Sequence, residues 1–204
     1  MTRLFDLSPP LSARLAVWPG DVPFSRTVTS LPDGMTFSSI TTTLHLGSHA
    51  DAPLHLVPGA AAIDEVPLET WIGPCQVVEA RVAPRGRVRL EDLAEPPSAP
   101  RLLLKTGTFR DRESFTGDFA GLDPSLAAEL AARGVVLVGI DTPSVDPYED
   151  DAFEAHRALV RAGIAWLEGL VLAHVPPGRY DLVALPLRIE GGDGSPVRAV
   201  LVAP

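Results

Sequence analysis

The sequence predicts a single α/β domain built on a mixed, barrel-like sheet. Predicted strands outnumber predicted helices, and one strand directly follows a helix, which indicates at least one parallel crossover. The 204 residues, of which 46% are hydrophobic, can bury a substantial core without dividing into smaller units. We therefore expect one domain over residues 1–204.

The individual elements follow from local patterns. Strands are predicted where short apolar or β-branched segments are bounded by Gly or Pro, at residues 36–46, 75–82, 101–105, 135–140 and 180–189. A helix is predicted over residues 123–133, because it opens with Asp-Pro, has apolar spacing and precedes a Gly. A second helix is predicted over residues 150–162, again before a Gly. Pro-rich sequence predicts a loop at the N-terminus.

Composition argues against nucleic acid and membranes as partners. The net charge is −9, and Lys105 is the only lysine beside sixteen arginines, so no basic stripe is available for a phosphate backbone. The first residues lack the apolar region of a signal peptide, and no apolar run approaches the ~20 residues that span a bilayer. We expect a soluble, cytoplasmic protein.

The single cysteine restricts the metal chemistry. Cys75 alone cannot form an internal disulfide or a four-thiolate zinc site, so a bound metal must depend on His, Asp and Glu. We expect Cys75 to be a small buried side chain. The chain has five histidines, and three of them lie within eleven residues, at positions 45, 49 and 55.

The segment from His45 to His55 predicts a metal-binding face. In an extended chain side chains alternate, so His45, His49, Asp51 and His55 would share one side while the other side is mostly apolar. Pro53 interrupts a continuous strand, and we expect a strand that runs into a loop. A polar surface strand would not concentrate three imidazoles and a carboxylate on one face.

Further ligands are expected elsewhere in the chain. His156 lies in the second predicted helix, and Glu168 interrupts an apolar segment, where an ionised carboxylate is costly unless it is paired or bound to metal. From the residues alone, a helix-surface role for His156 and a salt bridge for Glu168 remain equally open. His174, beside two prolines, is expected in a turn.

Three other features carry weaker hypotheses. Trp18, in a Pro-Gly loop, either stacks on an aromatic substrate or anchors the loop. Asp141 follows a predicted strand and either orients a ligating imidazole or caps the turn after it. Residues 191–194, Gly-Gly-Asp-Gly, predict a hairpin turn and match no phosphate-binding loop, so nucleotide cofactors are not expected.

The segment His45-Leu-Gly-Ser-His49-Ala-Asp51-Ala-Pro53-Leu-His55 resembles the His-x-Gly-(Thr/Ser)-His-x-Asp-x-Pro-x-His signature of the cyclase-type metal-dependent hydrolases. Within that family the chain is similar to the bacterial kynurenine formamidases. It shares with them the segments at 18–21, 73–75, 139–147, 185–188 and 195–199, so that the resemblance covers nearly the whole chain.

The resemblance implies a swivelling β/β/α-type fold, a homodimer, and a two-zinc site that hydrolyses a small aromatic formamide, N-formyl-L-kynurenine, to L-kynurenine and formate in tryptophan degradation. It implies His55 as the proton-transferring residue and Trp18 as a substrate contact. The metal ligands that it implies are His45, His49, Asp51, His156 and Glu168, with both carboxylates bridging.

Several alternatives remain at this stage. Another cyclase-type hydrolase, such as one that opens isatin, would have the same metal site and a different pocket. A non-catalytic protein could use the His/Asp cluster only to stabilise its fold. His55 could itself be a ligand, and imidazole with carboxylate also suits manganese or iron.

Overall fold

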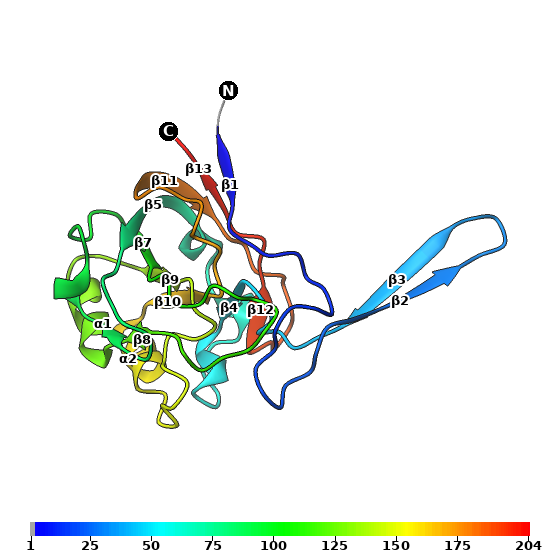
Figure 1. The fold of residues 1–204 in the computed structure, drawn as a ribbon, viewed down its shortest axis with the longest axis horizontal. Coiled ribbons are helices and arrows are strands. Elements are labelled where there is room, and N and C mark those ends of the chain that lie inside the picture. Colours follow the sequence, from blue (N-terminus) through cyan, green and yellow to red (C-terminus); the bar gives the residue numbers. More distant parts are fainter. Residues whose placement is uncertain (1–2) are drawn as a thin grey trace.

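A nine-stranded mixed sheet organises the computed structural model, which describes residues 3–204. The strands follow the order β1-β13-β11-β5-β7-β9-β10-β4-β12 (Figure 1). Their bounds are β1 Leu4–Asp6, β4 His49–Asp51, β5 Ile72–Glu79, β7 Arg101–Lys105, β9 Leu137–Ile140, β10 Ala165–Glu168, β11 Gly178–Val183, β12 Gly194–Pro196 and β13 Val200–Val202. The predicted mixed-sheet α/β class is confirmed.

The middle of the sheet is parallel and its outer parts are antiparallel. Strands β5, β7, β9 and β10 pair in parallel. Helix α1, Pro124–Ala131, precedes β9, and helix α2, Glu154–Ala162, connects β9 to β10, which confirms the predicted crossover. Asp123 caps α1 by accepting the Ser125 amide, and Gly163 ends α2 with a φ of 68°.

Two apolar layers cover the faces of the sheet. On β7, Leu102 and Leu104 pack with the helices, whereas Leu103 packs on the opposite face. This alternation follows from the two-residue period of a strand, and burial on both faces explains the continuous apolar run in β7. Cys75 packs in the same layer as Leu103 and is buried, as predicted.

A two-stranded hairpin projects from the body of the molecule (Figure 1). It consists of β2, Ser25–Ser30, and β3, Thr36–Thr41. The predicted strand at 36–46 therefore ends at Thr41, and its partner β2 was not predicted. Every residue of both strands is exposed, so the hairpin lacks the alternation of buried and exposed positions that identifies a strand in sequence.

Smaller elements complete the fold. Strands β6, Arg87–Val88, and β8, Gly121–Leu122, form a separate parallel pair. Short 3-10 helices are η1 Pro53–His55, η2 Ile63–Glu65, η3 Leu68–Thr70 and η4 Leu90–Asp92. None of the helices in residues 3–204 has the length and apolar content needed to cross a membrane. The extent of one domain, residues 1–204, stays a prediction, because residues 1 and 2 lie outside the described part.

Candidate active site

The histidine segment is less extended than predicted. Only His49–Asp51 forms a strand, β4; His45 lies in the turn before it, and His55 ends η1. A φ of 68° at Gly47 makes the turn, which explains why alternation fails at His45. Within β4 the predicted alternation holds, because His49 and Asp51 contact the other polar groups while Ala50 packs in the apolar core.

Strand β10 brings Glu168 to this segment. The antiparallel register places Glu168 opposite His49 and Trp166 opposite Asp51. Directly after β10, a Cβ at position 169 would lie 2.0 Å from the carbonyl oxygen of Gly47, so only glycine fits there. The two segments, about 120 residues apart in the chain, are thus held in contact by backbone packing.

Asp51 contacts imidazoles with both of its oxygens. Oδ1 lies 2.7 Å from His45 Nδ1 and 3.4 Å from His49 Nε2. Oδ2 lies 3.5 Å from His156 Nε2 and accepts a hydrogen bond from Trp166 Nε1 at 3.0 Å. One buried carboxylate therefore lies between two groups of nitrogen donors.

Glu168 has the same arrangement. Its Oε2 lies 3.1 Å from His49 Nε2, and its Oε1 lies 3.2 Å from His156 Nε2 and accepts the Val145 amide at 2.7 Å. Within residues 3–204 the ion-pair partners of Glu168 are these two histidines, and no arginine pairs with it. The helix-surface alternative for His156 is wrong, because its side chain is 3% exposed. Glu168 forms ion pairs, but with two histidines rather than with an arginine.

Hydrogen bonds at Nδ1 fix the ring orientations of His49 and His156. His49 Nδ1 donates to the Gly47 carbonyl at 3.0 Å, and His156 Nδ1 donates to Asp146 Oδ2 at 2.6 Å. In both rings Nε2 is then left for the carboxylates and for a metal, a common arrangement of metal-binding histidines. The Asp146 carboxylate also accepts the backbone amides of Ala155 and His156 at the start of α2.

The two roles considered for Asp141, orienting an imidazole or capping the turn after it, are both absent from the structure. Within residues 3–204 its side-chain hydrogen bonds come from Thr106 and Gly107 and none comes from an imidazole. Asp146 lies in the same 139–147 segment that carried the family resemblance, but nothing in its spacing from His156 identified it. The contact depends on how the segment between β9 and α2 folds back against the start of α2.

Electrostatics in the cluster favour a cation. Burial opposes a proton on His45, but hydrogen bonds and charge from Asp51 and Asp193 outweigh it and raise its pKa to about 9. Burial would raise the pKa of Asp51, yet the contacts with His156 and His45 hold it well below its usual value. The pKa of Glu168 is also lowered, because His156 and His49 outweigh burial and the Asp51 charge.

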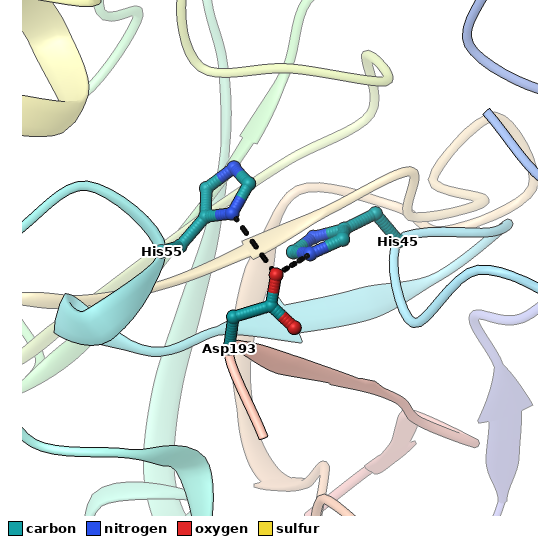
Figure 2. Close-up of side chains that lie close together, drawn as sticks. All are labelled: His45, His55 and Asp193. Atoms are coloured by element: carbon teal, nitrogen blue, oxygen red, sulfur yellow. Dashed lines mark hydrogen bonds and ion pairs between the residues drawn. The ribbon is translucent and has the colours of Figure 1, made fainter. Parts of the chain in front are cut away.

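His55 and Asp193 lie beside this cluster (Figure 2). Asp193 Oδ2 is 3.2 Å from His45 Nε2 and 3.5 Å from His55 Nδ1. The rings of His45 and His55 are tilted by 35° with centroids 4.3 Å apart. His174, by contrast, packs near Phe5, apart from the cluster. Sequence reasoning missed Asp193, because it lies in a turn that was interpreted only as a hairpin.

A cavity of about 210 Å³ opens above the donors. His45, His49, Asp51, His55, His156 and Glu168 all line it, and its aromatic wall consists of Trp18, Phe109, Phe115 and Phe153. The ring centroid of Trp18 lies 5.3 Å from those of Phe115 and Tyr148, and these contacts anchor its loop. Trp18 also lines the cavity. The arrangement fits a flat aromatic molecule held over a polar floor.

The donor set fits metal ions. One group, His45, His49 and Asp51, and another, Asp51, His156 and Glu168, each place three ligand atoms within 4.8 Å of one another and share Asp51. A third group, His45, His55 and Asp193, meets the same distance and is less buried. Nitrogen and carboxylate donors around one shared carboxylate suit a divalent metal cofactor.

Comparisons with known proteins agree with this site. Residues 5–147 match the family described as "Putative cyclase". A structure described as a "Potential Metal-Dependent Hydrolase With Cyclase Activity" has a TM-score of 0.84 at 28% identity, covering 99% of this chain and 98% of that one. The fold and site thus define a metal-dependent hydrolase, and the chain belongs to the cyclase family.

Full-length relatives within the family carry a more specific name. Kynurenine formamidase of Sphingopyxis alaskensis is 41% identical over 206 residues, and that of Bordetella petrii is 42% identical over 207 residues. In both cases 98% of each chain is covered. Isatin hydrolase A of Labrenzia aggregata, at 23% identity and a TM-score of 0.76 with 99% and 94% of the two chains covered, shows the shared fold alone.

Proposed function

We propose that this chain is a kynurenine formamidase, which hydrolyses N-formyl-L-kynurenine to L-kynurenine and formate in tryptophan degradation. The observation that carries the proposal is the full-length identity of 41% and 42% to two proteins of that name. The aromatic-walled cavity over a floor of imidazoles and carboxylates supports it, because the substrate joins an aryl ring to a formamide.

The proposed cofactor is two zinc ions per subunit, with manganese as the alternative. His45, His49 and Asp51 would hold one ion, and His156 and Glu168 would hold the other, with Asp51 and Glu168 shared between them. In support, each of these two carboxylates places its two oxygens against different histidines. When bound, such ions activate water and polarise a carbonyl oxygen.

His55 is the proposed proton donor to the leaving group. Hydrolysis breaks the bond between the formyl carbon and the aryl nitrogen, and the departing nitrogen must gain a proton. An imidazole can supply that proton near neutral pH. His55 lines the cavity, and its side chain is 32% exposed, so it can exchange protons with solvent.

The cavity wall is the proposed site of the aryl ring. Trp18 faces the cavity from the N-terminal loop, and an indole offers a flat apolar surface for stacking. Replacing Trp18 by Ala should raise KM more than it lowers kcat, because the reacting end of the substrate lies at the donors. Replacement by Phe should preserve most of the binding.

A homodimer is the proposed assembly, and the projecting hairpin supports it. An isolated two-stranded hairpin is at best marginally stable in water. Here β2 and β3 also expose Val28, Phe37 and Ile40, at 48%, 54% and 58%. Light scattering should give twice the chain mass for the wild type, and Ile40→Glu should shift it toward the monomer. A monomeric wild type would contradict the dimer.

The decisive experiment combines metal analysis with a substrate comparison. Purified protein should contain about two zinc ions per subunit and should hydrolyse N-formylkynurenine, with isatin tested at the same enzyme concentration. Faster turnover of isatin would replace the proposed substrate while leaving the metal site intact. Full metal content with no hydrolysis of either substrate would favour a non-catalytic metal-binding protein.

A further inference from the structure

The turn of residues 191–194 carries one ionisable side chain, Asp193. Its backbone is fixed by pairing between strands: the Asp193 carbonyl accepts the Ala52 amide at 2.9 Å, and Gly194 lies opposite Asp51 in the register of β12 and β4. Backbone pairing therefore places Asp193 beside the metal donors, and the Asp193 side chain is not needed to hold the turn.

Glycine at position 194 allows this turn to approach His45 closely. A Cβ there would lie 2.8 Å from His45 Cε1 and 3.0 Å from the Ala50 carbonyl oxygen. Any other residue would displace the ring or the strand. The Gly-rich sequence of the turn thus has a structural reason beyond chain reversal, because it brings the backbone against a ring of the donor cluster.

The Asp193 carboxylate lies between two imidazoles, as Figure 2 shows. Its Oδ2 contacts both His45 Nε2 and His55 Nδ1, whereas the other nitrogen of His55 points away from the carboxylate. Within residues 3–204 these histidines are its ion-pair partners, and no Lys or Arg pairs with it. With 47% of its side chain exposed, Asp193 adds little stability through such pairs.

We propose that Asp193 is a positioning residue that orients His55 for proton transfer, an inference that rests on the proposed function. With its Oδ2 3.5 Å from His55 Nδ1, the Asp193 carboxylate favours a hydrogen on that nitrogen. The Nε2 of the same ring is then free to take up a proton from the hydrated formyl group and deliver it to the leaving nitrogen. By accepting the Nε2 hydrogen of His45, it leaves Nδ1 of that ring available as a metal donor. Carboxylates behind functional imidazoles commonly fix both orientation and tautomer.

The test compares two substrates that differ in whether the leaving group needs a proton, and it measures metal content in the same protein. In zinc-loaded Asp193→Ala, metal content should equal that of the wild type, and kcat for N-formylkynurenine should fall about 10- to 100-fold, with KM changed less than about twofold. For 4-nitrophenyl formate, whose phenolate leaves without a proton, kcat should stay within about threefold. Asp193→Asn keeps an oxygen acceptor and should recover part of the lost kcat.

The matched control is Asp64→Ala. Asp64 accepts the Gly191 amide at 3.1 Å and so supports the same turn without contacting either histidine. It should leave both reactions unchanged. Nitrogen NMR of the zinc-loaded wild type, with His55 assigned through His55→Gln, should show hydrogen on Nδ1, and in Asp193→Ala this preference should be lost.

Two results would overturn the inference. Loss of metal in Asp193→Ala would place the role of Asp193 at the metal site, directly or through His45, and equal losses of kcat with both substrates would remove its connection to proton transfer. The ring tautomer of His55 is read without any substrate. A wild type that fails to hydrolyse N-formylkynurenine would therefore contradict the proposed function, while the NMR result still decides the role of Asp193.

Discussion

The donor cluster and the rim of the cavity are built from different kinds of structure. The donors His49, Asp51 and Glu168 come from adjacent strands of the sheet, and their side chains are no more than 4% exposed. On the rim, His55 ends a short 3-10 helix and Asp193 lies in a turn, with side chains 32% and 47% exposed. One region is buried, and the other is partly open to solvent.

The difference indicates that the buried cluster binds metal and that the rim acts on the substrate. Each buried donor has at least two polar contacts within the protein, which hold its side chain in place. His55 has one ion-pair partner and a tilted contact with the His45 ring, so its position depends on fewer neighbours. We therefore expect substitutions in the cluster to remove metal, and substitutions on the rim to retain metal but alter turnover or substrate binding.

The largest effect should come from Asp51→Ala. This change removes the carboxylate that both donor groups share, so metal content and hydrolysis should both be lost; His49→Ala should behave in the same way. Metal per subunit, measured on protein whose folding is checked by circular dichroism, tests the prediction. His174→Ala is the matched control, because His174 packs near Phe5 outside the cluster. Normal metal in Asp51→Ala would remove Asp51 from the ligands.

The sequence predicted the parts of the fold that local patterns determine. Strand β7 is predicted to the residue, because burial on both faces leaves an uninterrupted run of three leucines at residues 102–104, shortly after Pro100. Helix α1 has its cap, its proline and its terminal glycine in the sequence. In the hairpin, β3 lies within a predicted strand, whereas β2 was not predicted, since no face of the hairpin is buried in this chain.

The same distinction applies to the site. His49 and Asp51 were recognised together because a strand places residues two apart on one face. Asp146 and Asp193 were missed because their contacts depend on how distant segments pack: Asp193 is 148 residues from His45 in the chain. No spacing rule covers such a pair, and only the register between β12 and β4 brings it together.

Glu168→Gln should have the next largest effect. The amide keeps the shape of Glu168 but removes one negative charge between His49 and His156, so metal content should fall from about two ions to about one per subunit. Activity should drop at least about 100-fold, the scale of a lost electrostatic element. Glu113→Gln, which changes an exposed partner of Arg14, should preserve both. An unchanged metal count with wild-type turnover would contradict the shared carboxylate.

His55→Ala should retain metal and lose turnover. The donors stay in place, whereas protonation of the leaving nitrogen is lost, so kcat should fall by about 10²- to 10⁴-fold, the usual contribution of a general acid. Metal analysis and steady-state kinetics on the same preparation measure both quantities. If the variant instead loses one ion per subunit, His55 belongs to the donors and the division between cluster and rim is wrong.

The smallest effect should come from Phe153→Gly. This variant tests whether the strained backbone at Phe153 is retained because its side chain contacts the substrate. Phe153 lines the cavity with a left-handed backbone, φ 52° and ψ 49°, which costs an L residue about 1–2 kcal/mol. Glycine relieves that strain, so Tm should stay the same or rise. Loss of this aromatic contact, worth about 0.5–1.5 kcal/mol, should raise KM about 2- to 10-fold with kcat nearly unchanged.

The control is Arg85→Gly. Arg85 has a φ of 63° and pairs with Asp118, so this change relieves similar strain and should leave KM unaltered. An equal KM in Phe153→Gly and wild type would mean that the strained residue does not contact the substrate, and that the aromatic wall for the substrate consists of Trp18, Phe109 and Phe115.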